Sequence, residues 1–250
     1  MTNKESLLTP PVTTSHSRSQ PSARSRAYLG TLAAIVWKEV RVERHTRRTL
    51  SVMLVFSLAA VVVFNFALEL ELDAARRVSS GLLWIVILLA STLGLNRSLA
   101  AEQEARSIDA LLIAPVDRSA LYLGKVISVL LFVLLLEAIL LPLFIAFFNK
   151  PYWRPQVILI IILGTIGYIA AGVLVASMSI QTRTRDVLLP VLLLPLSLPA
   201  VLSAATAVSA FMGPELPTWS EVQAPIALVI AFDILMLTAG LFTYHYVVEE

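Results

Sequence analysis

The fold class of this chain is decided by residues 126–148, which read VISVLLFVLLLEAILLPLFIAFF. These 23 residues include a single charged side chain, that of Glu137. The hydrocarbon core of a bilayer is about 30 Å thick, and an α-helix with a rise of about 1.5 Å per residue needs about 20 apolar residues to cross it. The segment therefore predicts a transmembrane helix.

Five further stretches have similar length and composition: 50–68, 78–95, 157–180, 187–212 and 224–248. The whole chain is 58% hydrophobic and 14% charged, with a mean hydropathy of +0.82, whereas soluble domains are about 45–50% apolar and about 25% charged. We therefore expect an all-α integral membrane protein with six transmembrane helices. Pro190, Pro195 and Pro199 predict that the fifth helix is kinked or broken.

The positions of the basic residues predict how the chain is oriented in the membrane. Of the 19 lysines and arginines, 15 fall in residues 1–49, 96–125 and 181–186, and four fall in the loops between them. Cytoplasmic loops carry an excess of Lys and Arg. Both termini are therefore expected in the cytoplasm.

The first 49 residues divide into two segments. Residues 1–26 are rich in Ser, Thr, Pro and Arg without an apolar run, which is typical of a disordered cytoplasmic tail. Residues 27–49 are expected to form an amphipathic interfacial helix before the transmembrane domain 50–250. Its apolar stripe consists of Leu29, Leu32, Ala33, Val36 and Val40, with Trp37 beside it. The basic residues Lys38, Arg41 and Arg44 lie away from that stripe. Such a helix lies in the lipid headgroup layer; the alternative is a helix that simply caps the bundle.

Residues 96–125 predict a second cytoplasmic element, because a turn between adjacent helices needs only about 2–8 residues. Glu102 and Arg106 have a favourable ion-pair spacing on a helix. Ile108, Leu111 and Leu112 follow as a short apolar stripe that Pro115 ends. This element is expected either to dock on a cytoplasmic partner or to cover the base of the bundle.

Two acids lie inside predicted spans, Glu137 and Asp233. Each costs about 2.5–3.5 kcal/mol to insert, so each should face the bundle interior. They are protonated, bonded to hydroxyls such as those of Ser128, Ser203 or Thr238, or paired across a subunit interface. They either line a proton or substrate pathway or join helices as polar contacts. A face for close helix packing is predicted by the small residues Gly164, Gly167, Ala171, Gly172 and Ala176.

Catalytic and metal-binding patterns are missing from the sequence. The Gly124-Lys125 pair lacks the first glycine and the following Ser or Thr of a phosphate-binding loop. His16, His45 and His245 do not cluster, and there is no cysteine. We therefore expect no enzyme activity, no metal site and no directly bound cofactor. The net charge of +2 gives no reason to expect nucleic acid.

Together, the interfacial helix, the six spans and the cytoplasmic element between spans two and three resemble an ABC-2-type exporter permease. Four motifs narrow the resemblance to the CcmB family, the haem exporter protein B permeases of cytochrome c maturation. They are WKEVRVER at 37–44, GLNRS at 94–98 with EQE at 102–104, LLIAPVDR at 111–118, and YLGK at 122–125. The resemblance covers about residues 30–250, and 94–125 is its most specific part.

This resemblance implies a permease homodimer in the bacterial inner membrane, joined to a CcmA-like ATPase that binds ATP and to CcmC-, CcmD- and CcmE-like proteins. Haem is the implied substrate. The residues that meet the ATPase would be Glu102, Glu104, Arg106, Asp109, Leu111, Leu112 and Pro115. Three functions stay open: haem export, a scaffold that releases a haem-loaded chaperone without carrying substrate, and a general exporter of lipid, drug or polysaccharide.

Overall fold

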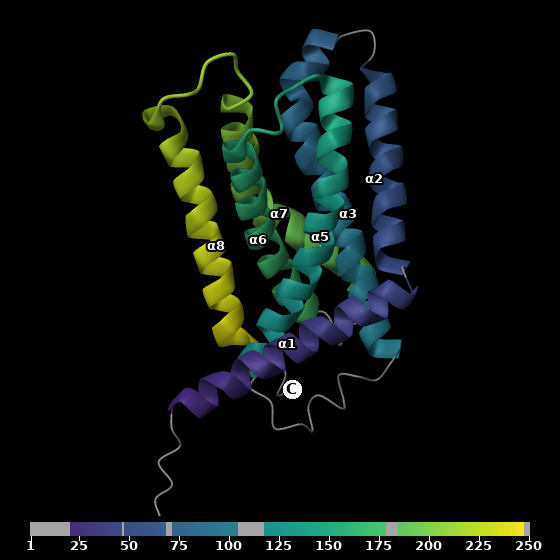
Figure 1. The fold of residues 1–250 in the computed structure, drawn as a ribbon, viewed down its shortest axis with the longest axis vertical. Coiled ribbons are helices and arrows are strands. Elements are labelled where there is room, and N and C mark those ends of the chain that lie inside the picture. Colours follow the sequence, from purple (N-terminus) through teal and green to yellow (C-terminus); the bar gives the residue numbers. More distant parts are fainter. Residues whose placement is uncertain (1–20, 47, 69–71, 105–117, 179–184, 248–250) are drawn as a thin grey trace, which may run out of the picture.

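The computed structural model describes residues 21–46, 48–68, 72–104, 118–178 and 185–247, and every regular element within them is a helix (Figure 1). There are seven: α1 (Pro21–Thr46), α2 (Arg48–Ala67), α3 (Leu72–Glu104), α5 (Arg118–Phe148), α6 (Pro155–Met178), α7 (Arg185–Ala210) and α8 (Trp219–Val247). No strand occurs in the part of the chain that is described. The expected all-α architecture is confirmed.

Six of these helices are long and apolar enough to cross a membrane. The spans are Thr49–Ala67, Val78–Ser98, Ser119–Phe148, Pro155–Met178, Leu188–Ala210 and Trp219–Thr243. They coincide with the six predicted spans to within a few residues at most ends. Of the two outcomes predicted for the fifth span, a kink or a break, the break does not occur, because α7 stays helical through Pro190, Pro195 and Pro199.

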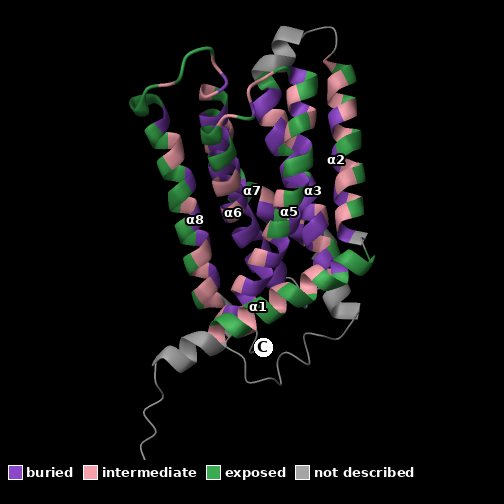
Figure 2. Cartoon of the chain, viewed as in Figure 1, coloured by how far each residue is buried: buried purple, intermediate pink, exposed green. Residues whose placement is uncertain are grey.

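Helix α6 occupies the centre of the bundle. Sixteen of the 24 residues of α6 are buried, and α6 contacts α3, α5, α7 and α8. Figure 2 shows the contrast with α2, with mostly buried residues on α6 and a mixture of exposed and intermediate residues on α2. The helix that these four helices pack against is therefore the described helix with the most glycines, Gly164, Gly167 and Gly172.

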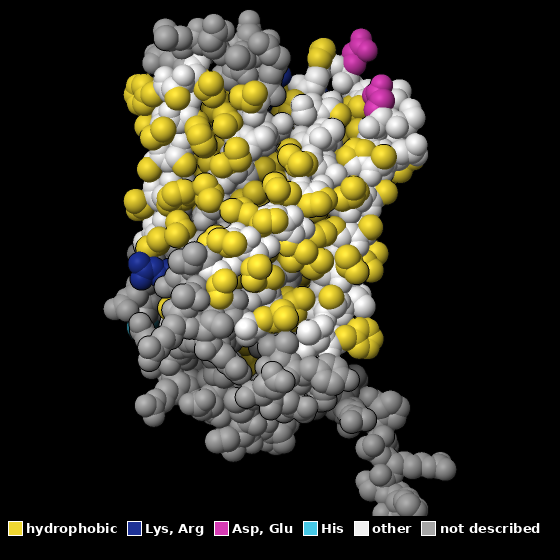
Figure 3. Space-filling view, turned by 180° about the vertical axis from the view of Figure 1, so that it is seen from behind, with side chains coloured by type: hydrophobic (Ala, Val, Ile, Leu, Met, Phe, Trp, Pro, Cys, Tyr) yellow, Lys and Arg dark blue, Asp and Glu magenta, His cyan; other side chains and the backbone are white. Residues whose placement is uncertain are grey.

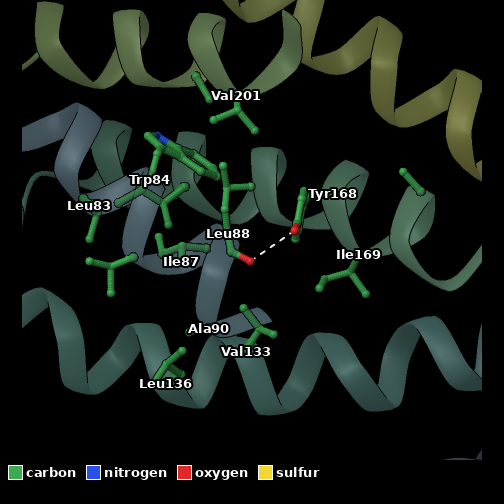
Figure 4. Packing of buried hydrophobic residues seen from close by; sticks show 14 of the residues in the cluster. Leu83, Trp84, Ile87, Leu88, Ala90, Val133, Leu136, Tyr168, Ile169 and Val201 are labelled. Atoms are coloured by element: carbon green, nitrogen blue, oxygen red, sulfur yellow. Dashed lines mark hydrogen bonds between the residues drawn. The ribbon is translucent and has the colours of Figure 1, made fainter. Parts of the chain in front are cut away.

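The glycines of α6 receive large side chains from its neighbours. A Cβ at Gly164 would collide with the Trp84 ring of α3, and one at Gly172 would lie 2.5 Å from Cδ1 of Leu95. Close to Trp84, the Tyr168 hydroxyl donates a hydrogen bond to the Leu88 carbonyl of α3 at 3.1 Å (Figure 4). The predicted packing face on α6 is confirmed, and α3 is one of its partners.

The end of the bundle opposite α1 is closed by short loops. Asn149 ends α5 with a φ of 50°, and the Arg154 guanidinium donates to the carbonyls of Phe211 and Gly213 at 2.5 and 3.0 Å. Tyr152 is fully buried in an edge-to-face contact with Phe144, and burial raises the pKa of its hydroxyl to about 12. Trp153 and Trp219 are exposed here, as expected for interfacial aromatic residues.

The outer surface of the spans is hydrophobic. Seen from behind, apolar side chains cover most of the described surface between the two ends (Figure 3). They include exposed residues of α2, α7 and α8 such as Val55, Leu202 and Phe242. An exposed apolar surface of this extent is typical of contact with lipid.

Replacing Gly164 with Ala tests the central packing of α6. The added methyl group collides with a buried ring that has no room to move, so we expect a loss of about 1–3 kcal/mol of stability, measured as a lower melting temperature in detergent. Gly81→Ala is the matched control, because no atom lies within 4 Å of its added Cβ. Equal melting temperatures for the two variants would contradict the packing described.

Candidate functional site

A buried lysine lies at the end of α5 nearest α1. The Lys125 side chain is only 7% exposed. Its ammonium group donates to Ser98 Oγ of α3 at 2.6 Å and lies 3.6 Å from the Glu39 carboxylate of α1. A buried charge is tolerated when it is paired and hydrogen-bonded, and here the two partners come from two other helices. Lys125 therefore joins α1, α3 and α5.

The first turns of α5 make two further contacts with α1. A Cβ at Gly124 would lie 2.9 Å from Cγ2 of Ile35, so the glycine allows α1 to approach closely. One turn earlier, Ser119 Oγ donates to the Tyr28 hydroxyl at 3.2 Å. Residues 28, 35 and 39 recur at seven and four positions, which places them on one face of a helix. Helix α1 thus crosses the base of the bundle with this face against α5 (Figure 1).

Tyr122 extends this contact region into the bundle. Its hydroxyl lies within hydrogen-bonding distance of the Ala170 carbonyl of α6, at 3.0 Å, and of the Met236 carbonyl of α8, at 3.3 Å. A Cβ at Gly240 would collide with the Tyr122 ring, so this glycine makes room for the ring. We call Ser119, Tyr122, Gly124 and Lys125 the α5 junction. It connects α5 with α1, α3, α6 and α8.

A second acid of α1 fixes the start of α2. Glu43 is buried, and its carboxylate accepts a hydrogen bond from the Leu50 backbone N–H at 2.8 Å. The first N–H groups of a helix have no partner within the helix, and a carboxylate there also interacts favourably with the helix dipole. Glu39 and Glu43 are one helical turn apart, so the face of α1 that meets the bundle is acidic as well as apolar.

The contacts of the α5 junction were not predicted from the sequence, which indicated only a cytoplasmic element at 96–125 between spans two and three. In the structure α3 continues to Glu104 and α5 begins at Arg118, so most of this range extends the two spans as helix. The available signal was a charged residue, Lys125, directly before a long apolar run. Its partners Glu39 and Ser98 belong to the quoted motifs at 37–44 and 94–98.

The residues predicted to meet an ATPase are only partly within the described chain. Glu102 and Glu104 belong to the last turn of α3. The others lie outside the described residues: Arg106, Asp109, Leu111, Leu112 and Pro115.

The residues of the predicted interfacial helix lie on α1 with different exposures. Lys38, Arg41 and Arg44 are exposed, and the Arg41 guanidinium lies 5.7 Å from the centre of the Trp37 ring, which is itself 60% exposed. The apolar stripe is divided, however. Three of its residues, Leu32, Val36 and Val40, are half-buried, whereas Leu29 and Ala33 are exposed. The reason is that α1 contacts α5 through residues 28, 35 and 39.

The two intramembrane acids both contact α6. Glu137 of α5 is 3% exposed, and its carboxylate accepts a hydrogen bond from Thr165 Oγ1 at 2.5 Å. The Asp233 carboxylate of α8 is buried directly against Gly167. Both acids face the interior, as expected. The hydroxyls of Ser128 and Ser203 bond to carbonyls of their own helices instead.

These acids do not form one cluster. Thr165 and Gly167 are two positions apart, and successive residues of an α-helix are turned by about 100°, so they point to different sides of α6. Each acid joins one neighbouring helix to α6. Among the described residues there is also no group of three metal-ligating side chains.

Thr165→Val tests the contact between Glu137 and α6. The valine has nearly the same shape but leaves the buried carboxyl group without its donor, so we expect a loss of about 1–3 kcal/mol, measured by thermal unfolding in detergent. Thr206→Val is the matched control, because this exposed hydroxyl donates only to the Leu202 carbonyl of its own helix. A Thr165→Val variant as stable as Thr206→Val would rule out a stabilising bond to Glu137.

The sequence was compared with known proteins and protein families. Proteins called "Heme exporter protein B" are similar to it: 28% identical in Rhodobacter capsulatus, over 70% of this chain and 80% of the relative, and 25% identical in Bradyrhizobium diazoefficiens, over 84% and 94%. One from Pseudomonas aeruginosa is 28% identical over 63% and 71%. The sequence model described as "CcmB protein" matches residues 30–249, which is nearly the whole chain. This multi-pass membrane protein belongs to the CcmB family.

Proposed function

We propose that this chain is the membrane permease subunit of an ATP-driven complex that exports haem, or releases a haem-loaded chaperone, in the biogenesis of c-type cytochromes. The observation that carries the proposal is the family match over residues 30–249. The similar bacterial proteins are called "Heme exporter protein B", which supports haem as the cargo. The six candidate spans are consistent with a permease.

The chain would act together with other proteins. ATP would be bound and hydrolysed by a CcmA-like ATPase, two permease chains would form a homodimer, and CcmC-, CcmD- and CcmE-like proteins would handle haem. The complex would reside in the bacterial inner membrane with both chain ends in the cytoplasm. In support, α1 and the C-terminal end of α8 lie at the same end of the bundle (Figure 1), and 15 of the 19 basic residues are assigned to that side.

In this proposal the chain performs mechanical coupling and has no catalytic residue of its own. The ATPase would bind at the coupling element within 96–125, which includes Glu102 and Glu104 at the end of α3. Its movement would tilt the second and third spans, α3 and α5, between two packings. The α5 junction supports this route, because the end of α5 is bonded to α1, α3, α6 and α8.

One observation favours coupling without transport through this chain. The Glu137 carboxylate accepts a hydrogen bond from Thr165 of α6, whereas Asp233 packs against Gly167 with its Oδ1 lacking a hydrogen-bond partner among the described residues. A polar side chain used as Glu137 is joins helices and does not line a path. Under this second candidate, the complex releases a haem-loaded chaperone and the substrate never enters the bundle.

Reversing the charges of Glu102 and Glu104 to Lys tests the coupling element. We expect the ATPase to be lost from the purified complex, because complementary charges at a docking surface become repulsive. The readouts are the amount of ATPase that co-purifies and the amount of c-type cytochrome formed in cells. Glu215→Lys is the control, since this exposed acid follows α7 at the opposite end of the bundle. Unchanged ATPase binding in the double variant would refute the assignment.

Purification from native membranes in mild detergent tests the function itself. We expect an ATPase and haem-handling proteins in the preparation, together with the visible absorption band of haem. An ATPase without haem or haem-handling proteins would contradict the proposal and favour a general exporter of lipid, drug or polysaccharide. Substituting Glu137 and Asp233 then separates the two candidates, because only a transport path through the bundle makes haem export depend on both acids.

A further inference from the structure

Of the two ion pairs that Glu39 forms, the pair with Lys125 is the less exposed to water. Glu39 has two basic neighbours: Lys125 at 3.6 Å and Lys38 at 4.0 Å. The Lys38 side chain is 47% exposed, whereas those of Lys125 and Glu39 are 7% and 14% exposed. Exposed ion pairs contribute little, because water and salt screen them. The contact between Glu39 and Lys125 is largely removed from water.

Separating the buried pair is costly. If α1 moved away from α5, the Lys125 ammonium group would lose the Glu39 carboxylate while remaining between α3 and α5. An ion taken out of water and left without its partner is strongly destabilised. The close contact between Gly124 of α5 and Ile35 of α1 also opposes sliding of the two helices past each other. The ends of α1, α3 and α5 are therefore held as one unit.

The position of this unit gives it a role in coupling. Helices α3 and α5 are the two spans that flank the coupling element, and α1 continues into α2, whose first turn is bonded to Glu43. A displacement applied at the end of α3 or α5 would reach α2 by direct packing, and it would reach α1 through these contacts at the base. The buried pair joins opposite charges in a site with little water.

We propose that Lys125 is a positioning residue. Its contacts with Glu39 and Ser98, which we call the lock, hold α1 against the ends of α3 and α5. Because of the lock, a movement of the partner ATPase moves α1, α3 and α5 together. This rests on the proposed function, since it requires an ATPase partner. Without the lock, α3 and α5 move but α1 does not follow. Less c-type cytochrome is then formed for each ATP hydrolysed.

The test uses the complete complex and a double-mutant cycle of Lys125→Met, Glu39→Gln and the two together. Three quantities are measured: the amount of complex purified, its rate of ATP hydrolysis, and the c-type cytochrome formed in cells. We expect assembly and hydrolysis to persist while cytochrome formed per ATP hydrolysed falls about two- to thirty-fold, the range for substitutions along a coupling route. The double variant should be no worse than either single variant, because both remove the same contact.

Controls separate the lock from general effects of charge or stability. Lys150→Met and Glu215→Gln remove one charge of each sign at the opposite end and should leave all three quantities unchanged. Lys125→Arg keeps the charge and should restore most of the output. Glu39→Gln removes the charge of the other partner of the pair with almost no change of shape. It therefore tests the lock even if Lys125→Met reduces the yield of complex.

Distinct results overturn each proposal. Losses from the two single substitutions that multiply in the double variant would contradict the lock, as would a loss with Lys38→Met as large as that with Lys125→Met. Cytochrome and ATP hydrolysis that fall in strict proportion would also contradict it, because the chain would then remain coupled. If the unmodified complex brings down no ATPase or haem-handling protein, the proposed function fails instead.

Discussion

Polar groups that the bundle removes from water must find their partners inside it, and this constraint decides which helices meet. An unsatisfied polar group costs several kcal/mol in a hydrocarbon environment. Three buried polar side chains meet this need at contacts between helices: Lys125 between α1, α3 and α5, Glu137 between α5 and α6, and Tyr168 between α6 and α3.

The same contacts divide the molecule into two levels. In the middle of the bundle, α6 has glycines where its neighbours present Trp84, Leu95 and Asp233, so helices approach closely and are held by packing. At the base, the α5 junction uses hydrogen bonds and one ion pair. A change applied at the base can therefore be passed along α5 into a tightly packed centre, which suits a subunit that responds to a separate ATPase.

The spans and their number could be predicted from the sequence, because length and apolar composition alone determine whether a helix crosses a bilayer. The packing face of α6 was also predictable from Gly164, Gly167 and Gly172. The contacts made at the ends of α3 and α5 were not. Lys125 lies just before an apolar run, and the sequence alone does not show which side chains its ammonium group meets.

Partners distant in sequence explain the remaining differences. Glu39 and Thr165 lie far along the chain from Lys125 and Glu137, and nothing in the local pattern pairs them. For α1, hydrophobic spacing predicted a stripe through Leu29 and Ala33, but the contacts with α5 pass through Tyr28, Ile35 and Glu39. The face that α1 turns toward the bundle is set by what it packs against as well as by its own periodicity.

The central claim, that α1 and α5 move as one unit, can be measured as a distance. The chain contains no cysteine, so spin labels attached at Leu29→Cys on α1 and Leu135→Cys on α5, both exposed, report without background. In the complete complex, assembled with one labelled copy of the chain and with cysteine-free partner proteins, we predict one narrow distribution of distances between the labels, unchanged when a non-hydrolysable ATP analogue is added. A second distance or a broad distribution on nucleotide binding would contradict the account, because α1 would then move independently of α5.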